Sequence, residues 1–458
     1  MRKVAGLMAL LATGCASMEP VYVRPDSAIP VSWPQGDAYL RQTEAELPAV
    51  TYRDIFTDPR LQTLIGQALV NNRDLLIAAA NIAAAREQVR IQRAQQLPQV
   101  DASAGASGTG DSNDVSTRFD VGVGVSGFEL DLFGRLRSLT DVQRNRYFAT
   151  ESAARATRLS LVSDIASAWL TYSADASLLK IAEDTVASAE KSVRLTRARL
   201  EGGIAPRTDL RQAQQILEAA KADAADQRTA LAQDVNLLRL LVGAEIDPSL
   251  LPASIDQVAP TVKDLPAGLD STILLRRPDV VEAEYQLRAA NAQIGAARAA
   301  LFPRITLTGL LGLASTSIAG LFSGGAFQWS PAGNATYSIF QGGAGRANVR
   351  LTEAQKAAAV ATYQQAIQRA FREVSDALAR RGTIDEQLRA RQAQREAAAD
   401  TYLLTEARYR NGIDSFLNSL DAQRSFYSAQ RTLVLSRLEA TSNLVELYRS
   451  LGGDSSLG

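Results

Sequence analysis

The sequence contains few residues that could carry out covalent or acid–base chemistry. Its 458 residues include no His and a single Cys, Cys15. The usual general base and the commonest metal ligand are therefore missing, and a lone Cys excludes disulfides and thiolate metal clusters. Lys plus Arg balances Asp plus Glu at 49 each, so no basic excess points to nucleic acid as a partner. With no P-loop motif either, we expect no enzyme, no cofactor and no metal site.

The one thiol lies at the end of a secretory signal. "MRKVAGLMALLATGC" has a basic start, an apolar run from Val4 to Leu11 and small residues before Cys15. This pattern is typical of a signal peptide, here residues 1–14. The ending "LATGC" resembles a bacterial lipobox, although Ala12 replaces the usual Leu, and this implies that Cys15 begins the mature chain and carries lipid. By the same resemblance to bacterial lipoproteins, Ala16 after the Cys, rather than Asp, favours the outer membrane. The alternative is a plain signal peptide with an incidental Cys.

The first half of the mature chain passes from an extended arm to helix, strands and helix again. Residues 15–57 contain five prolines and predict an extended arm. From 58 to 96 the apolar spacing is helical. Residues from about 98 to 132 then alternate, with Val, Ala and Phe separated by Gly, Ser and Asp, which predicts two strands of membrane-crossing length, about 9–11 residues each.

A helical hairpin of unusual length is predicted next, over about 135–243. Its apolar positions recur every three and four residues, as in a coiled coil. Some 60 residues of helix would span about 90 Å. Gly202 and Gly203 end the first arm, and Pro206 begins the return arm.

The hairpin tip occurs twice. "LTRARLEGGIAPRTDLRQAQ" begins at Leu195 and "LTEARYRNGIDSFLNSLDAQ" at Leu404, an offset of 209 residues (404 minus 195). Repeats at this scale indicate a duplicated architecture. The predicted boundaries are 58–243 for the first repeat, 244–275 for a Pro-rich linker, 276–452 for the second repeat and 453–458 for the tail. Within the second repeat we expect strands at about 303–340 and a helical hairpin at about 343–451.

Four strands cannot close a membrane barrel, and an open sheet edge in lipid leaves backbone groups without partners. The chain must therefore assemble with copies of itself. Three chains would give 12 strands, an even number within the range of bacterial barrels. The fold class expected is mostly α with a β-barrel portion, in which a trimer forms a 12-stranded β-barrel on a 12-helix tunnel. A trimer with a barrel attached to a helical tunnel, and without catalytic residues, would be a conduit. A lipid-anchored coiled-coil scaffold is the rival, but it has no need for the alternating segments.

Five stretches carry a family resemblance that covers nearly the whole mature chain. They are "FTDPRLQTLIGQALVNNRDLLIA" from Phe56, "FELDLFGRLR" from Phe128, "LLRRPDV" from Leu274, "LFPRITL" from Leu301 and "ARYRNGIDSFLNSLDAQRSFYSAQ" from Ala407. In these stretches the sequence resembles the TolC-like outer-membrane factors, in the lipidated OprM/NodT-type branch of Gram-negative bacteria. This resemblance implies a homotrimer in the outer membrane that crosses the periplasm.

The resemblance also implies partners and a cargo. A periplasmic adaptor (membrane fusion) protein and an inner-membrane pump of the resistance–nodulation–division class would complete a tripartite efflux system, with the pump supplying the energy. The chain would then be a passive conduit for drugs or other small molecules. Metal ions and secreted polypeptides stay open as alternative cargoes, because the tube architecture is shared and no residue selects among them.

Candidate gate residues lie at the hairpin tips. Asp414 and Asp421 match positions where family members place acidic residues that narrow the entrance, and three copies would form carboxylate rings whose repulsion raises the pKa of some members. Asn418 replaces a second acid of some relatives. The alternatives are that Asp414 caps the return helix and that Asp421 lies on a solvated face. Further candidates are Tyr409 and Arg410 as ties between arms, Arg207 and Asp209 as ties from the first tip, and Gly202, Gly203, Ile204, Gly412 and Ile413 as hairpin turns that dock the adaptor.

Overall fold

A computed structural model describes most of the mature chain: residues 17–26, 29, 51–110, 115–262 and 271–453. The predicted signal peptide and Cys15 lie outside the described residues, as do most of the predicted arm and all but the first residue of the predicted tail.

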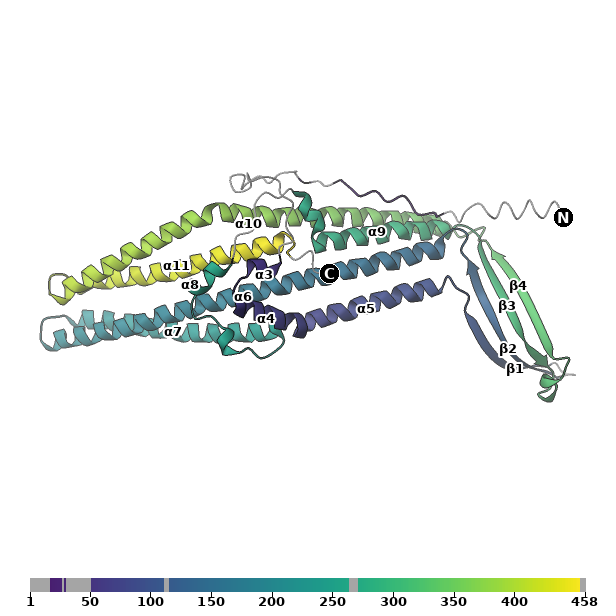
Figure 1. The fold of residues 1–458 in the computed structure, drawn as a ribbon, viewed down its shortest axis with the longest axis horizontal. Helices are drawn as coiled ribbons and strands as arrows, with labels where there is room; N and C mark the ends of the chain where they lie inside the picture. Colours follow the sequence, from purple (N-terminus) through teal and green to yellow (C-terminus); the bar gives the residue numbers. More distant parts are fainter. Residues whose placement is uncertain (1–16, 27–28, 30–50, 111–114, 263–270, 454–458) are drawn as a thin grey trace. The chain divides into compact units, whose positions relative to one another are not determined.

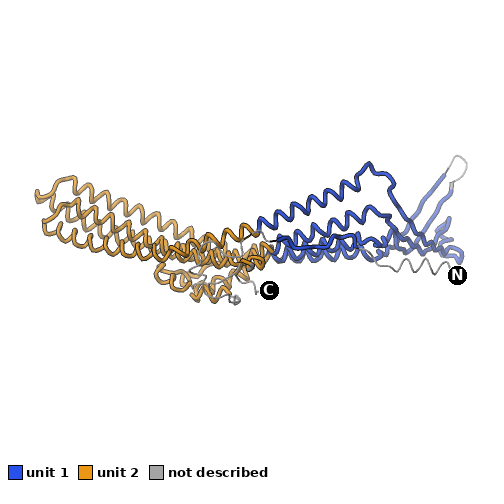
Figure 2. Tube along the Cα trace, turned by 90° about the horizontal axis from the view of Figure 1, so that it is seen from above, with its two compact units in different colours: residues 1–27, 79–153, 281–366 blue, residues 28–78, 154–280, 367–458 orange. Residues whose placement is uncertain are grey.

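The chain divides into two compact units, each built from separate stretches of sequence (Figure 2). Unit 1 comprises residues 1–27, 79–153 and 281–366 and holds the sheet. Unit 2 comprises residues 28–78, 154–280 and 367–458 and holds both hairpin tips.

The order helix, two strands, long helix, helix occurs twice (Figure 1). The first set is α5 (Arg73–Ala94), β1 (Val100–Gly110), β2 (Val115–Leu130), α6 (Arg135–Glu201) and α7 (Arg207–Val242). The second set is α9 (Pro278–Ala299), β3 (Arg304–Ser315), β4 (Phe327–Thr336), α10 (Ala344–Arg410) and α11 (Phe416–Ser450). The two long helices, α6 and α10, have 67 residues each. The mostly helical, twice-repeated fold predicted from the sequence is confirmed.

Short elements surround these two sets. They are α3 (Tyr52–Ile55), α4 (Pro59–Asn71), η1 (Pro248–Leu250), α8 (Ile255–Val258), η2 (Ala259–Thr261), η3 (Ser271–Arg276) and η4 (Ala319–Phe322). None of the helices that the structure describes combines the length and the apolar composition needed to cross a membrane.

The stretch predicted to be helical over 58–96 consists of two helices, α4 and α5. The helix is interrupted at Asn72, whose backbone is extended, with φ −62° and ψ 132°. The Asn72 side chain accepts a hydrogen bond of 3.1 Å from the Leu75 N–H and donates one of 2.8 Å to the Leu241 carbonyl. Because the side chain caps the next helix and binds another segment, it favours a break over a continued turn.

The break is part of a clasp that both repeats share. Asn72 binds the Leu241 carbonyl near the end of α7, and Arg277 donates a hydrogen bond of 2.7 Å to the Ser450 carbonyl at the end of α11. The two carbonyls are 209 residues apart (450 minus 241), the offset of the tip repeat. The Arg277 side chain is 8% exposed and also pairs with Asp279 and Glu373, at 2.9 and 2.8 Å. Each hairpin is therefore tied at its return end to the start of its repeat.

The four strands form one antiparallel sheet in the order β1-β2-β3-β4. The expected end of the last strand at Phe340 is wrong, because β4 ends at Thr336. Thr336 pairs with Arg304, the first residue of β3, and Pro303 before it has no N–H to extend the ladder. The pairing of β2 with β3 shifts between Val125 and Phe128, where Gly127 has φ +68°, a backbone region that favours glycine.

The described part of the predicted Pro-rich linker forms short helices that pack within unit 2. Ile255 and Val258 of α8 are buried, and the Thr57 N–H donates a hydrogen bond of 2.9 Å to the Thr261 carbonyl. Trp169 of α6 is fully buried, and its indole N–H donates to the Leu250 carbonyl at 3.0 Å. The segment thus contributes to the core of unit 2.

Candidate functional site

Both hairpins end in the same glycine turn. Gly203 follows α6 with φ +71° and Gly412 follows α10 with φ +72°, a region that favours glycine because a Cβ would clash there. Equivalent main-chain bonds of 2.9 Å close the two turns: the Ile204 N–H donates to the Arg199 carbonyl, and the Ile413 N–H donates to the Arg408 carbonyl. The sequence repeat at the tips is therefore a repeated helix C-terminal turn.

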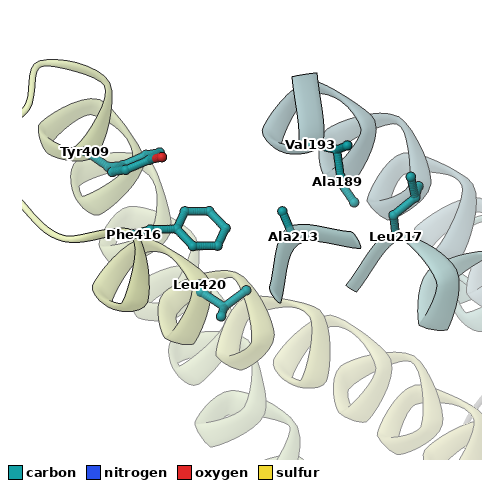
Figure 3. Packing of buried hydrophobic residues seen from close by; sticks show 7 residues of the cluster. All are labelled: Ala189, Val193, Ala213, Leu217, Tyr409, Phe416 and Leu420. Atoms are coloured by element: carbon teal, nitrogen blue, oxygen red, sulfur yellow. The ribbon is translucent and has the colours of Figure 1, made fainter. Parts of the chain in front are cut away.

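Side chains of both hairpins form one buried apolar cluster near the tips (Figure 3). Tyr409 is 5% exposed within it, and its ring lies 5.2 Å from that of Phe416. Burial raises the pKa of the Tyr409 hydroxyl, and the Arg199 guanidinium opposes this shift. The cluster therefore joins the two tips of one chain through apolar contact. Its members are Ala189, Val193, Ala213, Leu217, Tyr409, Phe416 and Leu420.

Asp414 makes an ion pair inside the second tip. Its carboxylate accepts hydrogen bonds of 2.6 and 3.3 Å from the Arg408 guanidinium. This bond holds the pKa of Asp414 below its usual value. The alternative that Asp414 caps the return helix is wrong, because Ser415 occupies the N-cap position of α11.

The other predicted gate residues are more dispersed. Asp421 is exposed on α11 and lines a cavity of about 510 Å³ with residues of α10 and α11. Arg410 pairs with Glu406 on its own helix at 2.7 Å. Arg207 is exposed at the start of α7, and Asp209 lies in the first turn of that helix. The structure brings Tyr409 against the first hairpin, where the Asp209 carboxylate of the first tip also raises the pKa of its hydroxyl.

Arg199 is the tip residue that sequence reasoning missed. The Arg199 guanidinium contacts both the ring and the main-chain carbonyl of Tyr409. The repeat contained a signal for this contact. Asp414 stands six positions after Arg408, whereas the position six after Arg199 is Ala205. With Ala at position 205, Arg199 lacks the equivalent of the Arg408–Asp414 pair and contacts Tyr409 of the other hairpin.

The register of the sheet gives it one apolar face. Along β2, Val121 and Val123 lie opposite Leu313 and Leu311 of β3. These two leucines lie opposite aromatic residues of β4 in turn. The apolar face carries Val121, Val123, Val125, Phe128 and Leu130 on β2, Ile305, Leu307, Leu311 and Leu313 on β3, and Phe327 and Trp329 on β4.

The opposite face of the sheet is polar or glycine-rich. Leu310 is the main exception, and its side chain covers Gly124, where an added Cβ would lie 2.5 Å from the Leu310 Cδ2. A sheet with one apolar and one polar face suits a wall between lipid and water. The polar face carries Asp101 and Ser103 on β1, Asp120 and Glu129 on β2, Arg304, Thr306 and Thr308 on β3, and Gln328, Ser330, Asn334 and Thr336 on β4.

Among the described residues, no group of three or more His, Cys, Asp or Glu side chains is placed to hold a metal ion. The features that stand out are instead the two tips and the two-faced sheet.

Comparison with known proteins agrees with this arrangement. The chain matches the family of outer membrane efflux proteins over residues 64–244 and 269–453. It is 43% identical to the antibiotic efflux pump outer membrane protein ArpC of Pseudomonas putida, covering 97% of this chain and 94% of that one. Identity to the toluene efflux pump outer membrane protein TtgI of Pseudomonas putida is 40%, covering 98% and 97%.

A solved structure gives the same result for the fold. The open state of the MtrE outer membrane channel of Neisseria gonorrhoeae aligns with a TM-score of 0.87 at 34% identity, covering 96% of this chain and 98% of that one. The chain belongs to the outer membrane efflux protein family, as a non-enzymatic outer-membrane channel component of a Gram-negative efflux system.

Proposed function

We propose that three copies of the chain close into one channel whose twelve strands cross the outer membrane. The two-faced sheet carries this proposal, because its order leaves β1 and β4 as edges that lipid cannot satisfy. All neighbouring strands are antiparallel, so β1 and β4 run in opposite directions. The β4 of one copy can therefore pair with the β1 of the next in the same pattern, which places the apolar face toward lipid and the polar face toward a lumen.

The two hairpins of each copy would then give a tube of twelve helices that reaches across the periplasm. A periplasmic adaptor protein would dock on the tips, and an inner-membrane pump of the resistance–nodulation–division class would supply the energy. Support for tip docking comes from two apolar side chains beside the glycine turns: Ile204 is 70% exposed and Ile413 is 62% exposed. Exposed apolar side chains at conformationally fixed turns suit a protein partner.

The cargo we propose is small lipophilic molecules, drugs and organic solvents included. The relatives named for antibiotic and toluene efflux cover nearly all of this chain. This assignment depends on likeness to these relatives.

The periplasmic entrance of the tube would be closed by the tips. Tyr409, held by Arg199, would keep the second tip against the first hairpin of the same chain. Asp414 and Asp421 would form carboxylate rings around the axis, and Arg410, Arg207 and Asp209 would contribute ties between neighbouring copies. Arg207, Arg410 and Asp421 are exposed, and Asp209 and Asp414 are half-buried, so each presents side-chain surface to such contacts.

Lipid on Cys15 would add an anchor at the membrane surface. Ser17, two positions after Cys15, begins the described chain, and the next residues bind α9 tightly. Asn291 is fully buried and donates to the Pro20 carbonyl at 2.8 Å, while Arg24 pairs with the buried Glu284. An added Cβ at Gly295 would lie 2.9 Å from the Glu19 Cα. Because α9 leads directly into β3, these contacts hold the start of the described chain near the point where β3 begins.

Single-channel conductance of the purified protein in a planar bilayer tests the channel directly. Discrete current steps from trimers support it. If trimers whose insertion has been confirmed carry no current, in the wild type and in variants with loosened tips, the chain is a scaffold that forms no pore.

A further inference from the structure

A cavity of about 800 Å³ lies in unit 1 where the strands join the helices. It is lined from three segments of the chain, 129–135, 299–306 and 334–346. The strand side chains that line it include Glu129, Thr306 and Asn334, all on the polar face of the sheet. The cavity therefore opens on the polar face, and its volume is in the range of small-molecule sites.

Two guanidinium groups at this cavity remain available to a ligand. Glu129 is held by Arg135 through two hydrogen bonds of 2.8 and 2.7 Å. Arg304 approaches the same carboxylate only to 3.5 Å, and its side chain is 60% exposed. Arg346, in the first turn of α10, has no ion pair among the residues that the structure describes. The lining carries three guanidiniums against the carboxylates of Glu129 and Asp131, so an anion is favoured over a cation.

Aromatic side chains supply an apolar wall beside these cations. Phe302 stacks on Phe133 with ring centroids 4.5 Å apart, which fixes its position. Tyr337 and Phe340 also line the cavity and are 58% and 89% exposed. An added Cβ at Gly345 would lie 2.7 Å from the Leu301 Cδ2, so the glycine lets α10 begin close against this wall. A site with guanidiniums on one side and aromatic rings on the other suits an amphiphilic anion.

We infer that this cavity binds organic anions that join a carboxylate or sulfonate to an aromatic or aliphatic body. Arg304 and Arg346 contact the anionic group, and Phe302, Tyr337 and Phe340 contact the body. The inference rests on the proposed function in one respect: the polar face lines the lumen, so the site takes up solutes on their way through the channel.

Equilibrium dialysis of 2-naphthoate against the full-length protein in lipid nanodiscs tests this site, with empty nanodiscs subtracted. We expect saturable binding by the wild type and a Kd raised about tenfold or more in the double variant Arg304→Gln/Arg346→Gln, since each lost contact is a charge-assisted hydrogen bond. The matched control is Arg118→Gln, on the polar face of β2, where Arg118 binds Gln328; its Kd should stay within about twofold of the wild type. Uncharged 2-naphthalenemethanol should bind the double variant and the wild type alike.

No saturable binding by the wild type, or an unchanged Kd in the double variant, would overturn the inference; the first result would also fit a second copy of the chain filling the cavity. If the double variant does not assemble, Arg346→Gln alone serves, because it leaves the Glu129 pair intact. Conductance separates the two proposals. Current steps without naphthoate binding would reject only this site. Naphthoate binding without current steps would retain the site and reject the proposal that the polar face lines the lumen of a channel.

Discussion

Arg199 and Tyr409 join the two tips of the chain. The Arg199 Nη1 donates a hydrogen bond of 2.8 Å to the Tyr409 main-chain carbonyl, and the guanidinium carbon lies 4.8 Å from the centroid of the Tyr409 ring. Arg408, the equivalent of Arg199 at an offset of 209, instead pairs with Asp414. Ala205 replaces that acid in the first tip, so Arg199 is free to cross to the other hairpin. The duplicated tip has thus diverged at one acidic position.

Replacing Arg199 with Ala should loosen the second tip from the first hairpin. The variant loses a charge-assisted hydrogen bond and a cation–π contact, together about 2 kcal/mol. If the tips close the entrance, single-channel conductance should rise or closed periods should shorten. The matched control is Arg211→Ala on the exposed face of α7, where Arg211 donates a hydrogen bond to Gln214 of its own helix. Equal conductance in Arg199→Ala, Arg211→Ala and the wild type would exclude this contact from the closure.

The double variant Asp414→Ala/Asp421→Ala tests the carboxylate rings. We expect a larger conductance with a weaker preference for cations, because six carboxylates leave the entrance of a trimer. Asp414 is also the partner of Arg408, so Arg408→Ala separates the two effects. If Arg408→Ala alone reproduces the change, the ion pair matters and the rings do not. If conductance and ion preference are unchanged in the double variant, the alternative holds that Asp421 simply lies on a solvated face of α11.

The repeated order of elements could be predicted because its signals are local. The glycine turns, the three-and-four spacing and the alternation in the strands are each visible within one segment. Three features are not local. The break at Asn72 depends on a carbonyl of α7, the end of β4 depends on where β3 begins, and the contact of Arg199 depends on a tip that is 210 residues away. A single sequence indicates such partners only through its repeat.

Cys15→Ser should abolish lipidation while trimers can still insert, because the strands themselves would hold the membrane. Labelling cells with a radioactive fatty acid measures lipidation, and separating the membranes by density measures location. We expect loss of label and partial retention in the outer membrane. If the variant does not reach the outer membrane while its signal peptide is still cleaved, the lipid is needed for sorting or insertion.

The two clasps, Asn72 on the Leu241 carbonyl and Arg277 on the Ser450 carbonyl, should contribute different amounts to stability. Arg277→Ala leaves Asp279, Glu373 and the Ser450 carbonyl without their partner and should cost about 3 kcal/mol. Arg277→Lys should not restore the loss, because the three acceptors are bound by three separate guanidinium nitrogens and a single ammonium nitrogen does not have that planar fork.

Asn72→Ala removes a cap and one hydrogen bond and should cost about 1 kcal/mol. Denaturant midpoints followed by circular dichroism measure both losses of stability, with Arg276→Ala, at an exposed neighbouring position, as the control. Equal losses in Arg277→Ala and Arg276→Ala would show that the guanidinium is not a structural tie.

Asp234 on α7 should make stability depend on pH. Burial, and then the nearby Asp175 carboxylate of α6, raise the pKa of Asp234 to about 6. The folded chain therefore keeps a proton that the unfolded chain, with its ordinary carboxyl pKa, loses at lower pH. Between about pH 4 and about pH 6 the folded state binds more protons, so stability falls as the pH rises through this window.

The apparent melting temperature of the wild type should decrease over that window, and Asp234→Asn should flatten the decrease because the amide does not titrate. Asp226→Asn, at an exposed position on the same helix, controls for the loss of a charge on α7. A melting temperature in Asp234→Asn that still follows the wild type from about pH 4 to about pH 6 would assign the dependence to another group.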